Sequence, residues 1–199
     1  MVDMAKNLLA IKAQLPEGVE LTAVSKFHPD EYITAAYNVG QRIFGESHEQ
    51  ELARKADSLP KDIHWHFIGH LQTNKVKYIA PYISMIESVD SIRLLREIEK
   101  QGARCGRRIR VLLELHIAEE ATKYGLTPDD CRSLLADGEW QQMEHVEICG
   151  LMMMASHTDD HDQIAREMDT AHSFFDEVRG KYFADQPSFR YRSWGMSDD

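Results

Sequence analysis

The sequence predicts an α/β fold of parallel strands, best described as a TIM-type (β/α)8 barrel whose final βα unit is missing. Seven short apolar runs recur along the chain, and each except the last is followed by a segment with helical spacing of apolar residues. Such alternation favours right-handed βαβ units around one parallel sheet. A doubly wound open sheet is the alternative, but no G-x-G-x-x-G sequence follows the first strand.

The N-terminal half contains four of these strands. A leading helix is predicted over residues 2–15, and Pro29 opens the helix that follows the first strand and ends at Gly40. Ser47 is predicted to cap the helix after the second strand, with Gln50 completing a capping box. The four strands are predicted at 21–26, 42–45, 63–68 and 83–88, and the helices after the last two at 72–79 and 91–101.

The C-terminal half contributes the other three strands. They are predicted at 108–117, 146–154 and 189–193, with a helix over 128–136 and a second one before the last strand. With 199 residues and 43% apolar content the chain can bury one substantial core. We therefore expect a single domain over residues 1–199.

Composition restricts the partners and the compartment. The formal net charge is −10 and Lys and Arg form no patch, so nucleic acid is not expected as a partner. The three cysteines are widely spaced, as in a reduced cytoplasmic protein. The N-terminus lacks signal-peptide features, and no apolar run approaches membrane-spanning length. We expect a cytoplasmic protein that does not engage a membrane.

Lys26 ends the first predicted strand, which is an unusual position for a lysine. Burial disfavours the charged ammonium and so lowers a lysine pKa, which leaves the amine nucleophilic. A neutral amine can form a Schiff base with an aldehyde such as pyridoxal 5′-phosphate. The alternative is a lysine whose stem follows the strand while its amine reaches solvent.

Several other polar or small residues also fall at predicted strand ends, where parallel barrels bind ligands. They are found at 45–47, at 69–70 and at Gly195. The segment 193–199 suits an anion, because Gly195 allows backbone amides to approach and Ser197 can cap a helix. An ordinary βα loop is the alternative for that segment, and residues 119–125 are interpreted as a solvated loop.

Two histidine pairs suggest a metal site as a competing hypothesis. His64 and His66 share a strand face, and His157 and His161 are four residues apart. Strand alternation alone explains the first pair, and no carboxylate is tied to either pair by its spacing. We therefore do not expect a bound metal. Met152, near the end of the sixth strand, has a side-chain type that usually fills cores.

Together these segments resemble the YggS/PROSC family of pyridoxal 5′-phosphate homeostasis proteins, which are related to the N-terminal barrel of alanine racemase. The resemblance covers nearly the whole chain, and its most specific part is the tryptophan-histidine segment at 65–75. The other matching segments are Ala23–Lys26 with Pro29, Phe44–Glu46, Glu120 with Lys123–Gly125, Gly150–Met152 and Gly195–Asp199.

The resemblance implies a fold-type III barrel that holds pyridoxal 5′-phosphate as a covalent aldimine on Lys26. It places the phosphate near the seventh strand and the ring near the third and sixth. Ser47 follows Glu46 where the family usually has asparagine, so an amide contact to the cofactor is lost or replaced. The residues implied at the cofactor are Lys26, Ser47, His66, Met152, Ser193, Gly195 and Ser197.

Family members also continue into an eighth unit, which carries a Gly-Ser-Thr phosphate loop and an arginine near the pyridine nitrogen. The sequence contains neither, so we expect a shortened form of a longer chain. We also expect that this form binds the cofactor more weakly than a longer one.

The function expected from the resemblance is that of a monomeric carrier or regulator in pyridoxal phosphate homeostasis. It would have no enzymatic turnover and only transient contacts with pyridoxal-phosphate-dependent apoenzymes. The first alternative is an amino-acid racemase, but racemisation needs a second base, which relatives take from an additional β domain. The second alternative is a metal-dependent barrel hydrolase that uses His64 and His66.

Overall fold

The computed structural model describes residues 4–117 and 124–195 of the chain. Within these residues seven strands form one sheet in the order β1-β2-β3-β4-β5-β6-β7, and every neighbouring pair is parallel. The strands are β1 (Ala23–Val24), β2 (Ile43–Glu46), β3 (His64–Phe67), β4 (Met85–Val89), β5 (Ile109–Leu115), β6 (Val146–Met154) and β7 (Tyr191–Gly195).

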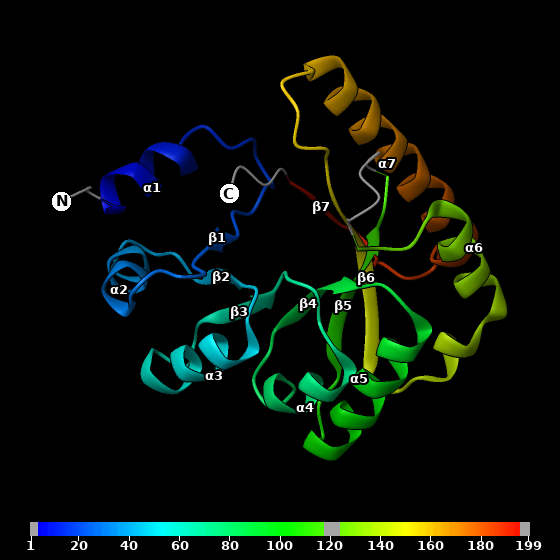
Figure 1. Cartoon of the computed structure of the whole chain (residues 1–199), viewed down its shortest axis with the longest axis horizontal. Helices are drawn as coiled ribbons and strands as arrows, with labels where there is room; N and C mark the ends of the chain where they lie inside the picture. Colours follow the sequence, from blue (N-terminus) through cyan, green and yellow to red (C-terminus); the bar gives the residue numbers. More distant parts are fainter. Residues whose placement is uncertain (1–3, 118–123, 196–199) are drawn as a thin grey trace.

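Helices connect successive strands and lie on the outer side of the curled sheet (Figure 1). The α-helices are α1 (Met4–Lys12), α2 (Asp30–Asn38), α3 (Glu49–Ser58), α4 (Val76–Ile79), α5 (Ile92–Cys105), α6 (Pro128–Asp137) and α7 (His161–Tyr182). Two 3-10 turns, η1 (Thr73–Lys75) and η2 (Glu139–Gln142), complete the described elements.

The strand order confirms the predicted fold class. Each strand pairs with the next one along the chain, as in a barrel wall, whereas a doubly wound sheet reverses its order at a switch point. β1 and β7 are the edges of the described sheet, so the architecture is an incomplete α/β barrel.

Side chains alternate along the strands between the two faces of the sheet: one set packs in the main core under the helices, and the other faces the barrel interior. In β5, Ile109, Val111 and Leu113 belong to the main hydrophobic core. Leu112 instead packs in a small inner cluster with Met85, Cys149 and Met152. This alternation is the two-residue period of a strand, and it gives the sheet a helix-covered face and an interior face.

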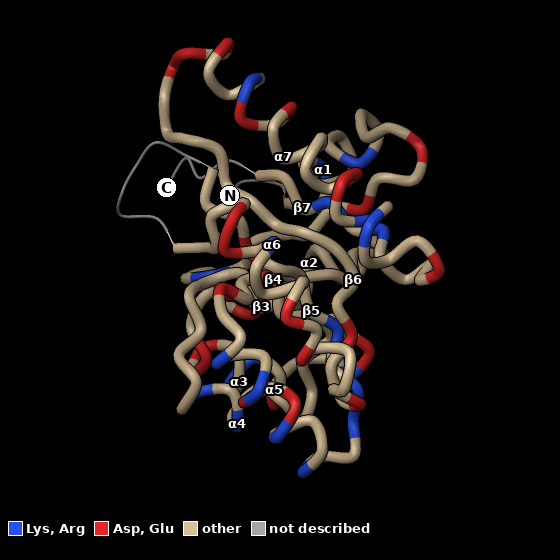
Figure 2. Tube along the Cα trace, turned by 90° about the vertical axis from the view of Figure 1, so that its right-hand side faces the viewer, with Lys and Arg blue, Asp and Glu red and all other residues tan. Residues whose placement is uncertain are grey.

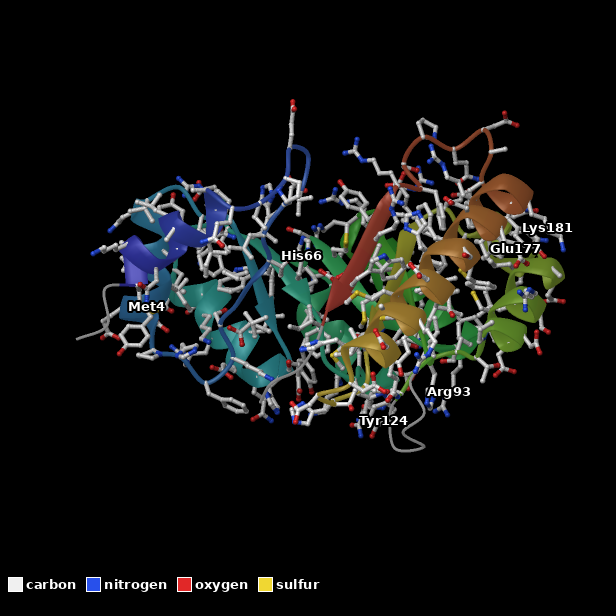
Figure 3. The ribbon with its side chains drawn as sticks, turned by 90° about the horizontal axis from the view of Figure 1, so that it is seen from above. Met4, His66, Arg93, Tyr124, Glu177 and Lys181 are labelled. Carbon is white, nitrogen blue, oxygen red and sulfur yellow. The ribbon has the colours of Figure 1, made fainter. Side chains whose placement is uncertain are left out.

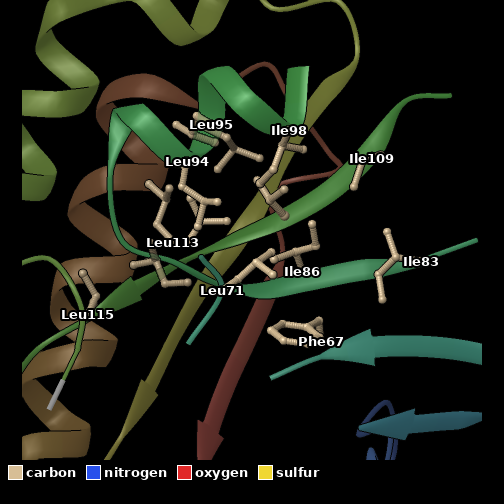
Figure 4. Packing of buried hydrophobic residues seen from close by; sticks show 14 of the residues in the cluster. Phe67, Leu71, Ile83, Ile86, Leu94, Leu95, Ile98, Ile109, Leu113 and Leu115 are labelled. Atoms are coloured by element: carbon tan, nitrogen blue, oxygen red, sulfur yellow. The ribbon is translucent and has the colours of Figure 1, made fainter. Parts of the chain in front are cut away.

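The main core lies between the sheet and the helices. Figure 4 shows how Leu94, Leu95 and Ile98 of α5 pack over the strands that carry Ile86 and Leu113. Each fully buried aliphatic side chain of this kind contributes about 1.5–3 kcal/mol through removal of apolar surface from water. Because the outward-facing residues pack against the helices, the inward-facing residues are available to form a binding site.

Two predicted positions are wrong. Ser47 does not cap α3, which begins at Glu49 with His48 at its N-cap and has no side-chain cap hydrogen bond. The parallel ladder continues past Phe67, since the Ile68 amide donates to the Glu46 carbonyl at 2.9 Å, and the chain turns into the helix only afterwards. The seventh strand also begins later than predicted and includes Gly195.

The reason for the second difference is the length of β6. Its last five residues, from Gly150 to Met154, pair one by one with Tyr191–Gly195. The ladder therefore includes Ser193, as predicted, and extends the strand to Gly195, which the sequence placed in a loop. Two smaller differences concern helices: Pro29 is the N-cap of α2 rather than its first residue, and the helix predicted over 72–79 divides into η1 and α4.

Charged residues of both signs are interspersed along the tube in Figure 2. Within the described part of the chain, no helix is both long and apolar enough to cross a bilayer.

Candidate functional site

Lys26 lies just beyond β1 and is partly buried. The β1–β2 ladder continues to its neighbour Ser25, whose amide donates to the Gly45 carbonyl at 2.9 Å. The Ser25 side chain points to the helix-covered face, where its hydroxyl donates to Glu46 Oε1 at 2.6 Å. Lys26 itself lies in the turn that follows this paired residue, at the carboxyl end of β1.

A buried ionic cluster lies behind this segment, on the helix-covered side. Lys55 of α3 is 0% exposed, and its Nζ donates to Glu46 Oε1 at 2.7 Å, to Glu51 Oε1 at 2.7 Å and to the Ser25 carbonyl at 2.6 Å. Burial raises the pKa of Glu46, although the hydrogen bonds from Lys55 and Ser25 act in the opposite direction. All three protons of the Lys55 ammonium are thus used.

A second polar network crosses the barrel interior. His66 Nδ1 of β3 lies 2.6 Å from Glu87 Oε1 of β4, and Ser193 of β7 donates its hydroxyl to Glu87 Oε2 at 2.6 Å. His66 is only 8% exposed and lies near the centre of the molecule in Figure 3. A carboxylate only accepts hydrogen bonds, so Nδ1 carries the hydrogen that faces Glu87, and Nε2 is the ring nitrogen left for another partner.

Glu114 is a further interior carboxyl, carried by β5 opposite Met152 of β6. It is 7% exposed, and its Oε2 atom has no hydrogen-bond partner among the described residues. Burial raises the pKa of Glu114 to about 7, and the charge of Asp90 adds to the effect. Asp90 in turn lies 3.5 Å from His70 Nδ1.

A cavity of about 620 Å³ occupies the interior of the curled sheet. Strands from β2 to β5 and β7 contribute to its wall, together with the segment that precedes β1. Its lining includes the His66–Glu87–Ser193 network and the apolar side chains of Met85, Leu112 and Tyr191. This volume falls within the range of small-molecule sites.

The structure brings some of the predicted site residues together. His66 and Ser193 share Glu87, and Met152 packs in the inner cluster with two residues of the cavity wall. Gly195 lies on the same face of β7 as Ser193, two residues nearer the end of the strand. A Cβ at Gly195 would meet no atom of the described residues within 4 Å, so these residues leave room beside the backbone at the end of β7.

Other predicted residues lie apart from this network. Ser47 is half-buried after β2, and Gly69 approaches it so closely that a Cβ there would lie 2.7 Å from the Ser47 carbonyl oxygen. Ser197 lies outside the described residues, as do Glu120 and Lys123. The Ser193 hydroxyl hydrogen is directed at Glu87, so its contact with a phosphate remains a prediction.

The histidine pairs do not form a metal centre in the described residues. His64 is exposed at the start of β3, whereas His66 is buried and bonded to Glu87. In the ranges that the structure describes, no three His, Cys, Asp or Glu side chains come together in a group that could hold a metal ion.

Sequence reasoning missed Glu87, Glu114 and Lys55. For Glu87 and Glu114 a signal was available, because each is a carboxyl inside an apolar run of predicted strand. For Lys55 there was none, since a lysine on an amphipathic helix is ordinarily solvated.

Known sequences provide an independent comparison. The family described as alanine racemase, N-terminal domain, matches residues 2–199. A pyridoxal phosphate homeostasis protein of Helicobacter pylori is 33% identical over 183 residues, which are 91% of this chain and 78% of that protein. A protein of the same name from Aquifex aeolicus is 32% identical over 182 residues, which are 90% of this chain and 77% of that protein.

Solved structures agree with this assignment. PipY of Synechococcus elongatus PCC7942, solved without PLP, has a TM-score of 0.86 at 30% identity, covering 97% of this chain and 96% of that chain. The same protein with PLP bound has a TM-score of 0.82 at 29% identity and the same coverage. Clostridium difficile alanine racemase, at 15% identity, shares the fold with a TM-score of 0.74 over 98% of this chain and 52% of its own.

The family match spans nearly the entire chain, and relatives above 30% identity cover more than two thirds of it. The resemblance to the pyridoxal phosphate homeostasis proteins is thus confirmed, and the chain belongs to the alanine racemase N-terminal domain family.

Proposed function

We propose that the protein binds pyridoxal 5′-phosphate as a Schiff base on Lys26 and takes part in the homeostasis of this cofactor. The observation that carries the proposal is the position of Lys26 at the carboxyl end of β1, the end of the strands at which parallel barrels bind their ligands. Support also comes from relatives that bear the name pyridoxal phosphate homeostasis protein and from PipY, which has been solved with PLP bound.

Schiff-base formation joins the lysine nitrogen to the aldehyde carbon, and the aldehyde oxygen leaves as water with the two amine protons. The residues present fit such a group. Met152 and its neighbours offer an apolar wall for a flat ring, and His66 offers Nε2 as a hydrogen-bonding partner beside it. The open backbone at Gly195 suits an anionic substituent, because amide groups can approach it there.

The proposal assigns the protein to carrying or regulating the cofactor rather than to turnover. Its described relatives are called homeostasis proteins, whereas the alanine racemases share only the fold at this level of identity. We propose a cytoplasmic monomer with transient contacts to pyridoxal-phosphate-dependent apoenzymes. Lys26 is the one base that we assign to the cofactor, while racemisation requires a base on each face of the substrate Cα.

The test of the cofactor linkage is chemical labelling. The purified protein loaded with pyridoxal 5′-phosphate should absorb in the visible region and should carry the label on Lys26 after borohydride reduction and peptide mass mapping. Lys26→Ala should lose the absorbance and keep its far-UV circular dichroism. Lys77→Ala is the matched control, since Lys77 of α4 lies outside the site. A label on Lys75 or Lys123 instead of Lys26 would refute the assignment.

The absence of racemisation is a separate prediction. Interconversion of L- and D-alanine should be no faster with the loaded protein than with free cofactor and added amine, because we assign only one base, Lys26, to the cofactor. Chiral chromatography of the reaction measures it. Protein-dependent interconversion that disappears in Lys26→Ala would show that the protein is a racemase.

A further inference from the structure

The backbone on both sides of Lys26 is held by side chains from the helix-covered face. On the N-terminal side, the Ser25 carbonyl accepts from Lys55 Nζ at 2.6 Å and the Ser25 hydroxyl donates to Glu46 at 2.6 Å. On the C-terminal side, the Phe27 amide donates to Glu51 Oε1 at 2.9 Å. Lys26 is thus bracketed by two fixed residues.

The side chains that bind this backbone are connected to one another by ion pairs. Lys55 lies between the two carboxylates, with 2.7 Å to Glu46 Oε1 and 2.7 Å to Glu51 Oε1. Glu46 and Lys55 have side chains that are 0% exposed, and the Glu51 side chain is 19% exposed. We call Glu46, Glu51 and Lys55 the bracket cluster. It connects the end of β2 and the first turns of α3 to the segment that carries Lys26.

Phe27 shows that the segment is held in an unusual conformation. Its φ of 63° lies in the left-handed region. Among the described residues, Phe27 is the only one other than glycine that has a positive φ. A bulky residue adopts this region only where its surroundings impose it. Phe27 is 75% exposed and so does not supply that restraint through burial. The hydrogen bond from its amide to Glu51 is a direct restraint at this point.

A purely stabilising role is a weak explanation for the bracket cluster. Buried ion pairs contribute little net stability, because the loss of hydration offsets most of the attraction. Apolar side chains of similar volume would fill the space between β2 and α3 equally well. Apolar side chains, however, could not donate a hydrogen bond to the Ser25 carbonyl or accept one from the Phe27 amide.

We infer that the bracket cluster is a positioning device for the Lys26 amine: it fixes the residues before and after Lys26 so that the amine meets the cofactor aldehyde in a reactive orientation. The inference rests on the proposed function. Glu46, Glu51 and Lys55 act on the reaction through the backbone, because their polar atoms lie on the face of β1 opposite to the interior. Orientation of reacting groups can alter a rate strongly without altering affinity.

The test separates bond formation from binding. Glu51→Ala removes the acceptor of the Phe27 amide, Glu51→Gln restores an oxygen there, and Ser25→Ala removes only the hydroxyl bond to Glu46. Asp57→Ala, an exposed carboxylate of the same helix, is the matched control. Stopped-flow absorbance gives the rate of Schiff-base formation with pyridoxal 5′-phosphate. Fluorescence titration with pyridoxine 5′-phosphate, which has an alcohol in place of the aldehyde, gives the binding affinity alone.

We expect Glu51→Ala to form the Schiff base about tenfold more slowly, with the pyridoxine 5′-phosphate affinity changed by less than about twofold. Glu51→Gln should recover most of the rate, Ser25→Ala should lose about threefold, and Asp57→Ala should match the unmodified protein. If Glu51→Ala does not fold, Ser25→Ala decides, since it leaves every charge of the cluster paired.

Two results would overturn the inference. One is an unchanged rate in folded Glu51→Ala and Ser25→Ala. The other is an equal loss of rate and of pyridoxine 5′-phosphate affinity, which indicates a general loss of structure. Failure of the proposed function is distinguishable, because the unmodified protein would then carry no borohydride-fixed label on Lys26.

Discussion

Three buried carboxyl groups differ in their surroundings: Glu46 lies in the bracket cluster, whereas Glu87 and Glu114 lie on the interior face of the sheet. Glu87 has both oxygens bonded, one near His66 and one accepting from Ser193. Glu46 has one oxygen bonded to Lys55 and Ser25. The Oε2 atoms of Glu114 and Glu46 both have no hydrogen-bond partner among the described residues, but the charge that affects the Glu114 pKa is the negative one of Asp90. A buried carboxyl without a cation favours its neutral form.

Glu114 therefore makes stability depend on pH. Its pKa is about 7 in the folded protein and 4.5 ordinarily, so between these values the folded state binds more protons than the unfolded state. The free energy of unfolding consequently falls as pH rises from 4.5 to 7, by up to about 3 kcal/mol at 1.36 kcal/mol per pKa unit. Below pH 4.5 this effect is absent, and above pH 7 it is complete.

Glu114→Gln removes this ionisation. At pH 8 the variant should be more stable than the unmodified protein by roughly 1–3 kcal/mol, and the advantage should shrink toward pH 4.5. Urea unfolding at the two pH values measures it. Glu144→Gln, at an exposed position before β6, is the control and should leave the pH dependence unchanged. Identical pH dependence in Glu114→Gln and the unmodified protein would contradict the prediction.

The sequence could place single residues on strands but could not pair them. The position of Lys26 at a strand end followed from the apolar run that precedes it. The partners of Glu87 did not follow, since Ser193 lies 106 residues away in the chain. The bracket cluster was equally invisible, because the contact between Lys55 and Ser25 spans 30 residues. The spacing of apolar residues predicts helices and strands, whereas these hydrogen bonds depend on how separate βα units pack against one another.

At the scale of elements, the alternation of strands and helices was enough to predict the parallel sheet and its order. The ends of elements were less predictable because hydrogen-bond ladders override local capping signals. Ser47 has a suitable side chain for a cap, yet the β2–β3 ladder continues beside it and α3 begins two residues later. At Ser91 and Thr127 the local signal holds, and both side chains cap their helices as their residue types favour.

The β6–β7 contact gives an element-scale prediction. The register between β5 and β6 shifts next to Gly150, and a Cβ at this glycine would collide with the carbonyl group of Tyr191. Gly150→Ala must therefore push the two strands apart, and we expect a loss of more than about 2 kcal/mol in the free energy of unfolding. Urea denaturation measures the change.

Gly180 of α7 is the matched control for that substitution. Among the residues that the structure describes, a Cβ at Gly180 would meet no atom within 4 Å, and the residue lies in an exposed part of the helix. Gly180→Ala should stabilise the protein by about 0.5–1 kcal/mol, because alanine restricts the unfolded chain more than glycine. A similar effect of both substitutions would show that the close approach of β6 and β7 is not limiting.

At the scale of the whole molecule, the sheet is unevenly supported. β5 and β6, in the half of the strand order that ends at β7, pair through seven registered positions. β1 pairs through two positions at one edge, and Val24 there is 49% exposed. The proposed cofactor attachment point thus adjoins a weakly paired edge strand, while the longest strand pairing lies several strands away.

This asymmetry predicts a gradient of hydrogen exchange. In the free protein, amides of β5 and β6 should exchange most slowly, and those of residues 23–27 at least about tenfold faster, because local opening needs fewer broken contacts there. Mass spectrometry of peptic peptides resolves the two regions.

Addition of pyridoxal 5′-phosphate should slow exchange at residues 23–27 and 191–195, since a Schiff base on Lys26 and contacts at the end of β7 restrain both edges of the described sheet. Lys26→Ala should lose the slowing at residues 23–27, because the covalent link to that edge is gone. Equal exchange in β1 and β5 would contradict the gradient, and unchanged exchange on cofactor addition would contradict a ligand that contacts both edges.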